Sequence, residues 1–389
     1  MSNLIKPSQE PIQGASQRIS LFLSYLGGGG AERVMLNLAM GFIQHGFEVD
    51  LVLSKAWGPH LWKVPSTVRV VDLGASRPLL SLPKLTQYLK REQPLALLAA
   101  MHYANEIAVL AKRLAGVSTQ ILVTEHNTLS RSINQLKGLK RRLIPLGVKR
   151  LYPLADHIVT VSKGARDDLQ HWINSPGATV EAIYNPVITD DLYQKAEVAV
   201  DHPWFQAGEP PVILGVGKLE RQKDFPMLIR AFAQVRSQQP CRLAILGWGP
   251  DKPELEALIA DLGLAEDAAL LGYVDNPYAY MARSRLFALS SAWEGLPTVL
   301  IEAMALGVPV VSTNCKSGPE EILNQGEFGN LVPVGDNNAM AESILAILQG
   351  NHPIVHKDWL KQFEIQGSVE QYLKLMGRPQ QMLVQSSAG

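Results

Sequence analysis

A run of glycines at residues 27–30 constrains the fold of this chain more than any other feature. The apolar residues 18–26 before it predict a buried strand, and the spacing of apolar residues over 31–45 after it predicts an amphipathic helix. Residues 47–53 form the next predicted strand. A strand, a glycine turn, a helix and a second strand make a βαβ unit, which requires parallel strands and a right-handed crossover. The N-terminal half therefore begins as an α/β fold.

Further predicted strands continue this pattern. Residues 96–100, 120–124 and 157–161 have the apolar composition of buried strands, and Ser162 is suited to cap a helix over 163–172. Between residues 186 and 211 the pattern loosens into prolines and acidic residues, which we interpret as a linker.

The second half repeats the same order of elements. It is predicted to contain strands at 211–216, 241–246, 285–289 and 308–312, a loop at 217–224, and helices at 225–237, 253–262 and 297–306. We therefore predict two Rossmann-like domains, residues 18–190 and 205–365, facing each other across a cleft. Residues 1–17 are predicted to be a disordered lead-in.

Composition narrows the class of protein. Of 389 residues 47% are hydrophobic and 19% charged, which is typical of globular chains with a core in each domain. The polar N-terminal residues lack the apolar core of a signal peptide, and the two cysteines, Cys241 and Cys315, lack metal-binding spacing. These features predict a cytoplasmic protein.

The net charge of zero hides an asymmetry between the halves. Residues 1–205 contain 22 Lys and Arg against 16 Asp and Glu, a balance of +6, whereas residues 206–389 contain 14 against 20, a balance of −6. The basic N-terminal half therefore predicts a contact with an anionic partner.

Glu294 and Glu302, eight residues apart, are the strongest candidates for function. Glu294 is in the predicted loop after the strand at 285–289, and Glu302 is about two turns into the helix that follows. Ligands of open α/β sheets bind at this carboxyl edge. Two carboxylates so placed can hold two parts of one ligand, because each accepts strong hydrogen bonds from neighbouring hydroxyls.

Lys218 and Lys223 lie in the loop after the first strand of the second half. Most lysine-rich loops are simply solvated, but cations here can also neutralise a departing diphosphate without a catalytic acid. The chain contains no Asp-x-Asp triplet with which to hold a divalent metal on a diphosphate, so we expect no metal or other cofactor. No glycine loop completes the Gly-x-Gly-x-x-Gly fingerprint, which disfavours a nicotinamide dehydrogenase.

The ordered set of motifs resembles the retaining glycosyltransferases of family 4, which have the GT-B fold. The resemblance runs from about residue 20 to residue 375. Its pieces are Gly-Gly-Ala-Glu-Arg at 29–33, Thr-Glu-His-Asn at 124–127, Val-Ser-Lys at 161–163, Tyr-Asn-Pro at 184–186, Gly-Lys-Leu at 217–219, Leu-Gly-Tyr-Val at 271–274, the Glu-x7-Glu run, and Gly-Val-Pro-Val-Val at 307–311. The chain looks similar to bacterial enzymes that build lipopolysaccharide, capsule or other cell-surface glycans.

The resemblance assigns roles to several residues. It implies that Glu302 binds the ribose of a nucleotide sugar, that Glu294 and His126 contact the donor sugar, and that Glu125 is a weaker candidate. The family usually has arginine at the position of Lys218, so the diphosphate contact of this lysine differs in geometry. The remaining residues of the implied donor site are Gly295, Leu296, Pro297, Thr298 and Val274 of the second domain and Gly29 and Gly30 of the first.

The resemblance also implies a UDP-sugar donor, retention of anomeric configuration, and a C-terminal helix at 366–377 that crosses back to the first domain. A front-face reaction, in which a diphosphate oxygen takes the acceptor proton, needs no enzymic base.

A basic segment occupies residues 131–150, with no Asp or Glu between Glu125 and Asp156. Its cations include Lys137, Lys140, Arg141 and Arg142. The plain interpretation is a solvated helix, but interleaved leucine and isoleucine favour contact with an anionic membrane surface or a lipid diphosphate. Nucleic acid is disfavoured because no aromatic stacking platform accompanies the charge.

Together these features predict a hexosyltransferase, cytoplasmic and peripheral on the inner face of the membrane, that acts on a glycan or lipid-linked acceptor. Two alternatives remain open on the sequence: a sugar-nucleotide epimerase and a non-catalytic sugar-nucleotide-binding subunit.

Overall fold

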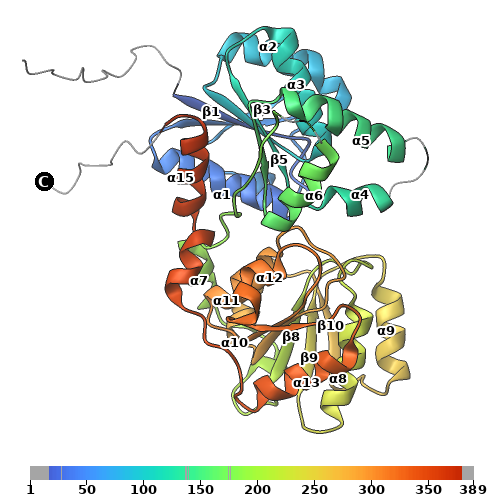
Figure 1. The fold of residues 1–389 in the computed structure, drawn as a ribbon. Coiled ribbons are helices and arrows are strands. Elements are labelled where there is room, and N and C mark those ends of the chain that lie inside the picture. Colours follow the sequence, from blue (N-terminus) through green and yellow to red (C-terminus); the bar gives the residue numbers. More distant parts are fainter. Residues whose placement is uncertain are drawn as a thin grey trace, which may run out of the picture.

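The computed structural model describes residues 17–378 apart from 28, 136, 137, 139, 174 and 176, and only the backbone of 132, 134, 135 and 140. The predicted lead-in therefore lies almost entirely outside the described residues. Two α/β domains are stacked one above the other, each built on its own parallel sheet (Figure 1). This is the GT-B arrangement that the sequence predicts.

The first sheet has seven strands in the order β3-β2-β1-β4-β5-β6-β7, and every neighbouring pair is parallel. Its strands are β1 (Arg18–Leu23), β2 (Glu48–Leu53), β3 (Arg69–Asp72), β4 (Ala96–Ala100), β5 (Gln120–Glu125), β6 (His157–Thr160) and β7 (Val180–Ala182). The strand order reverses direction between β1 and β4, which creates the switch point where such sheets bind ligands.

The second sheet has six parallel strands in the order β10-β9-β8-β11-β12-β13. They are β8 (Val212–Val216), β9 (Arg242–Leu246), β10 (Ala268–Gly272), β11 (Leu286–Leu289), β12 (Val310–Thr313) and β13 (Asn330–Val332).

Helices cover both faces of each sheet (Figure 1). Those of the first domain are α1 (Gly30–Gln44), α2 (Leu82–Glu92), α3 (His102–Ala115), α4 (Leu129–Gln135), α5 (Lys140–Leu151) and α6 (Lys163–Ile173). The rest are α7 (Asp190–Ala196), α8 (Phe225–Arg236), α9 (Lys252–Asp261), α10 (Pro277–Arg283), α11 (Thr298–Ala305), α12 (Pro319–Ile322), α13 (Asn337–Leu348), α14 (Lys357–Leu360) and α15 (Ile365–Leu375). Short 3-10 turns include η1 (Leu61–Lys63).

The first strand is shorter than predicted. It leaves the sheet after Leu23, because the next residues pair with the loop that follows β2: Leu26 N–H donates to Trp57 O at 3.0 Å, and Lys55 N–H to Ser24 O at 3.1 Å. Gly58 lies so close that a Cβ there would be 2.0 Å from Leu26 O. The glycine-rich loop is thereby packed against the loop after β2.

The predicted linker is more ordered than its composition indicates. It contains α7, whose N-cap Thr189 accepts a hydrogen bond from Leu192 N–H at 3.2 Å, and α7 packs on α10. Val187 N–H also donates to Phe363 O at 2.8 Å, so the two chain segments that connect the domains are paired with each other. The two connecting segments therefore run side by side and are joined by a parallel bridge between Ile188 and Glu364.

Helix α15 packs against α1, on the first domain (Figure 1). Val369 and Tyr372 of α15 are buried in the same hydrophobic cluster as Phe42 of α1. The two helices approach closely at Gly41, where an added Cβ would lie 2.4 Å from a methyl group of Val369. The C-terminal helix thus returns to the domain in which the chain begins.

Gly41→Val should loosen α15. Overpacking of this kind costs on the order of 1–3 kcal/mol, and the two β-branched side chains have little rotamer freedom with which to relieve it. We expect hydrogen–deuterium exchange of α15 to rise at least tenfold, while exchange in β8–β13 stays unchanged. The control is Gly177→Val, because a Cβ at Gly177 meets nothing within 4 Å. Unaltered protection of α15 in Gly41→Val would contradict this packing.

Candidate active site

The loops at the carboxyl ends of the two sheets meet between the domains. Gly295, in the loop after β11, contacts the loop after β5 so closely that an added Cβ would lie 2.3 Å from His126 O. Gly30, at the start of α1, faces the start of α11, with its Cβ position 3.9 Å from Thr298 Oγ1. The structure therefore brings the predicted residues of the two domains together at one edge.

A second contact closes the domains beside this edge. Glu321 of α12 accepts hydrogen bonds from the backbone N–H groups of Lys163 and Gly164, at 2.7 and 2.8 Å. These groups open α6 in the first domain, where the positive end of the helix dipole favours a carboxylate. Tyr184, between the domains, also donates to Glu321 at 3.2 Å.

Glu302 is the most deeply buried of the candidate carboxylates. Its side chain, on α11, is 1% exposed and accepts a hydrogen bond from Arg33 Nη1 at 2.8 Å. Arg33 Nη1 also donates to the hydroxyl of Tyr278, which lies 3.5 Å from the same carboxylate oxygen, Oε1. The other oxygen, Oε2, is buried and has no hydrogen-bond partner within the described part of the chain. Glu302 therefore has one occupied oxygen and one that is available to a ligand.

The protonation of Glu302 depends on these neighbours. Burial raises the pKa of Glu302, whereas the charge and hydrogen bond of Arg33 and the hydroxyl of Tyr278 lower it. Burial likewise raises the pKa of Tyr278, so that its hydroxyl stays a donor. The carboxylate form thus relies on Arg33, which comes from the other domain.

Glu294 is held by residues of its own domain. Its side chain is 7% exposed and forms an ion pair with Lys223, Nζ to Oε1 at 2.5 Å. Ser291 donates to the same oxygen at 2.6 Å, and Gln222 Nε2 lies 3.4 Å from Oε2. Lys223, predicted to meet a diphosphate, is therefore paired with Glu294 here, and the loop after β8 is tied to the loop after β11.

The other donor-site candidates lie in loops at the carboxyl edges of the two sheets. Lys218 is exposed, with no ion pair or hydrogen bond of its ammonium group to any described residue. Val274, in the loop after β10, is half-buried. Gly29 caps α1, and the segment Gly295, Leu296, Pro297 and Thr298 leads into the first turn of α11.

His126 has a defined tautomer. Thr124 Oγ1 donates to Ala99 O at 2.8 Å, so the bond of 3.1 Å between this hydroxyl and His126 Nε2 must be donated by the imidazole. Nδ1 is then an acceptor, and it is buried without a partner in the described structure. Burial lowers the pKa of His126 to about 4, which keeps the ring neutral. His126 therefore presents a hydrogen-bond acceptor beside Gly295.

Glu125, the weaker candidate, belongs to the interior of the first domain. It is 6% exposed and accepts hydrogen bonds from Tyr152 and from Asn105, the latter at 3.1 Å. Burial raises its pKa to about 7, against the effect of these two donors. Its partners hold β5 to α3 and the segment after α5, which indicates a structural role.

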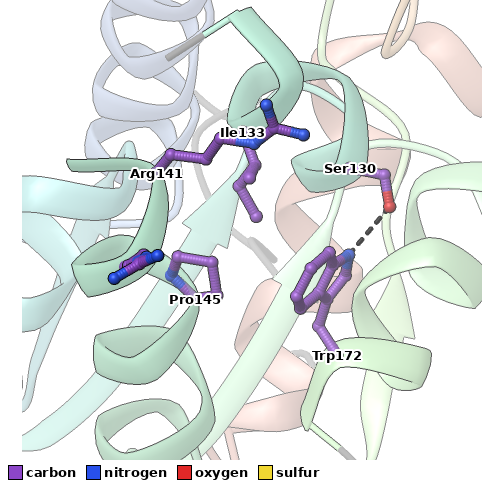
Figure 2. Close-up of a pocket in the computed structure, with 6 residues that line it drawn as sticks. Ser130, Ile133, Arg141, Pro145 and Trp172 are labelled. Atoms are coloured by element: carbon purple, nitrogen blue, oxygen red, sulfur yellow. Dashed lines mark hydrogen bonds between the residues drawn. The ribbon is translucent and has the colours of Figure 1, made fainter. Parts of the chain in front are cut away.

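The basic segment forms a groove on the first domain, not at the Glu302 edge. Ser130, Ile133, Arg141, Arg142, Pro145 and Trp172 line a hollow of about 460 Å³ between α4, α5 and α6 (Figure 2). Trp172 Nε1 donates to Ser130 Oγ at 2.8 Å, which joins α6 to α4. Leu143 and Leu146 of α5 are 52% and 43% exposed. Lys137 and the side chain of Lys140 lie outside the described residues.

Among the residues that the structure describes, no group of His, Cys, Asp and Glu could hold a metal ion. Within the same residues, no helix has the length and apolar character needed to cross a membrane.

Comparison with known proteins identifies the family. Residues 28–191 match the family described as Glycosyltransferase Family 4, and residues 201–362 match Glycosyl transferases group 1. A Campylobacter jejuni protein is 34% identical over 346 residues, which cover 86% of this chain and 90% of that protein. It is named N-acetylgalactosamine-N,N'-diacetylbacillosaminyl-diphospho-undecaprenol 4-alpha-N-acetylgalactosaminyltransferase. The chain belongs to the group 1 glycosyltransferases. It is thus a transferase, as the leading interpretation of the sequence predicted.

Other similarities agree with this assignment. The Rhizobium meliloti lipopolysaccharide core biosynthesis glycosyltransferase LpsE is 25% identical over 367 residues, covering 90% of this chain and 96% of that protein. The lipopolysaccharide outer core galactosyltransferase WaaB shares the fold, with a TM-score of 0.69, 21% identity and coverage of 92% of this chain and 99% of that one. Anabaena HepE, solved with UDP and glucose, has the same TM-score at 20% identity, covering 93% and 95% of the two chains.

Sequence reasoning missed the residues that hold the two carboxylates. Arg33 belongs to the Gly-Gly-Ala-Glu-Arg motif but was given no role, and Tyr278, Ser291 and Gln222 were not singled out. The Gly-Gly-Ala-Glu-Arg motif carried a signal for Arg33, since an arginine in the first turn after a ligand-binding loop faces the same edge. Nothing in the spacing of Tyr278 points to Glu302.

The tautomer of His126 is directly testable. In nitrogen-15 NMR spectra of histidine-labelled protein, its Nε2 should remain protonated and Nδ1 unprotonated from pH 8 to pH 5. The neutral form is favoured because burial holds the pKa near 4, so protonation below the usual value of about 6.5 costs folded-state stability. The variant His126→Gln, which lacks this imidazole, assigns the resonance. Titration of His126 between pH 6 and 7 would contradict the assignment.

Proposed function

We propose that this glycosyltransferase moves a hexosyl group from a UDP sugar to a lipid-linked glycan, with retention of anomeric configuration. The observation that carries the proposal is the pair of buried carboxylates, Glu294 and Glu302, which follow β11 and face the first domain. Glu302 has a free oxygen for a ribose hydroxyl, and Glu294 is paired with Lys223, one of the two lysines that would meet a diphosphate. The placement of Glu294 and Glu302 in the loop and the helix after one strand suits two parts of a single nucleotide sugar.

The donor would bind mainly to the second domain. Its ribose hydroxyls would donate to the buried carboxylate of Glu302. Its diphosphate would lie near Lys218, Lys223 and the first turn of α11, and Val274 would border the base. UDP is the proposed nucleotide because the structural neighbour HepE has been solved with UDP-glucose. In binding, the diphosphate would compete with Glu294 for Lys223, which frees Glu294 to accept from the sugar hydroxyls.

Cleavage of the donor would leave negative charge on the departing diphosphate. The bond between the anomeric carbon and the diphosphate oxygen breaks with its electron pair going to the diphosphate, and lysine cations stabilise that charge without a metal. The acceptor oxygen bonds to the anomeric carbon from the same face, and its proton passes to the leaving oxygen. His126, a neutral acceptor at Nδ1, would fix a donor-sugar hydroxyl rather than take the proton.

The acceptor would approach over the first domain. The Campylobacter relative is named for an acceptor built on diphospho-undecaprenol, and a related name describes a second transferase acting on a diNAcBac-PP-undecaprenol glycan. In this chain the groove beside α5 combines Arg141 and Arg142 with apolar side chains (Figure 2). Such a surface suits a lipid diphosphate at an anionic membrane, which would place the protein on the inner face of the cell membrane, in synthesis of lipopolysaccharide, capsule or a similar glycan.

Glu294→Gln tests the catalytic proposal. Transfer of sugar to acceptor should fall by about 100-fold or more, because a charged partner of the reacting sugar is lost, while UDP binding stays within about threefold. Mass spectrometry of products from a panel of nucleotide sugars measures transfer, and calorimetry measures binding. Glu342→Gln, on an exposed face of α13, is the matched control. Full transfer by Glu294→Gln would remove Glu294 from the site.

Neutralising the groove tests the membrane proposal. Arg141→Gln with Arg142→Gln should reduce affinity for vesicles of anionic phospholipid, measured by sedimentation, by roughly 30-fold, because each of the two cations near such a surface contributes about 1 kcal/mol. The charge-matched control is Lys84→Gln with Lys90→Gln, two exposed lysines of α2. Equal vesicle binding by both double variants would contradict a membrane role for the groove.

A further inference from the structure

Arg33 joins the two domains at the carboxylate that the proposed function assigns to ribose. It is in the first turn of α1, whereas Glu302 and Tyr278 belong to α11 and α10 of the second domain. Two contacts align α1 with α11: Gly30 faces Thr298, and Arg33 binds Glu302 one turn further along both helices. The guanidinium therefore reaches Glu302 only while the domains are closed on each other.

The two oxygens of the Glu302 carboxylate differ in their hydrogen-bond partners. Arg33 Nη1 is 2.8 Å from Oε1, and the hydroxyl of Tyr278 is 3.5 Å from the same atom. Oε2 is left buried and without a partner in the described chain. A buried oxygen in this state is destabilising unless a ligand donor reaches it. The ion pair thus fixes which oxygen is offered.

We propose that Arg33 is a positioning residue for the donor: it keeps Glu302 ionised and turned with Oε2 toward the ribose, and so links ribose recognition to domain closure. The inference rests on the proposed function of Glu302. The ion pair between Arg33 and Glu302 need not break when the donor binds, because the ribose hydroxyls would donate to Oε2 while Arg33 stays bound to Oε1.

The charged groups around Glu302 indicate that its ionisation depends on Arg33. The groups that face Glu302 are Arg33 from α1 and Tyr278 from α10, and burial is the main influence that raises its pKa. Glu321 of α12, which also packs on α11, is bound to the start of α6, and Lys357 and Asp358 of α14 are exposed. The charged and titratable groups around the Arg33–Tyr278 pair are His60, Lys63, Asp191, Tyr273 and Asp275.

The affinity for the donor should depend on pH through the ionisation of Glu302. Only ionised Glu302 accepts from both ribose hydroxyls, so affinity is present above its pKa and is lost as the pH falls through it. Without Arg33 the pKa of Glu302 lies higher, and the loss of affinity moves to higher pH.

Calorimetric titration with UDP and with 2′-deoxy-UDP, from pH 6 to pH 9, tests the inference. Wild-type protein should prefer UDP. Arg33→Met should bind UDP about ten- to hundredfold more weakly at pH 7, lose most of the preference for the ribose 2′-hydroxyl, and regain affinity toward pH 9. Arg33→Lys should restore much of the affinity for UDP and much of the preference for the 2′-hydroxyl. The control variant Arg113→Met, which changes an exposed arginine of α3, should match wild type in both.

The outcomes separate the two proposals. If Arg33→Met keeps the wild-type preference and pH profile, the role of Arg33 is overturned while the donor site stands. If Glu302→Gln keeps the preference for UDP over 2′-deoxy-UDP, or if wild-type protein binds neither, the donor site itself is wrong and the inference falls with it. Thermal denaturation of each variant shows that the binding changes occur in folded protein.

Discussion

The parallel pairing of every strand is the constraint on which the rest of the structure depends. In a parallel sheet all strands end at one edge, so each connecting loop delivers its side chains to the same place. Here the two edges are turned toward each other: the loop after β5 brings His126 against Gly295 of the loop after β11, and the start of α1 brings Arg33 to Glu302. A site between two such edges needs no residue from the sheets themselves.

The two domains share a small apolar contact, in which Val161 of the first domain joins the buried cluster of the second, and are otherwise held by local polar contacts. The two connecting segments are hydrogen-bonded to each other at Val187 and Phe363, and α15 packs the end of the chain against α1. Across the site, the closing contacts are the ion pair of Arg33 with Glu302 and the carboxylate of Glu321 at the start of α6. These closing contacts involve few residues, which suits a site that must admit a donor and release a product.

Much of this fold could be predicted from the sequence, because strand, turn and helix signals are local. The helices that follow the glycine loop and Pro297 begin within a residue of their predicted starts. The helix inside the linker was missed because its stability comes from packing on α10, which composition does not reveal. Glu294 and Glu302 lie in the loop and the helix after β11, as the strand pattern predicts, but the residues that pair with them were not predicted. The pairing of Lys223 with Glu294, and of Arg33 with Glu302, depends on distances between residues 71 and 269 positions apart.

The central claim is that one nucleotide sugar binds to both edges at once. Hydrogen–deuterium exchange with and without a UDP sugar tests it most directly. The account predicts that saturating donor protects the loop and first turns around Glu294 and Glu302 together with the segments around Arg33 and His126. Protection confined to one domain, or centred on the far ends of the strands, would contradict it.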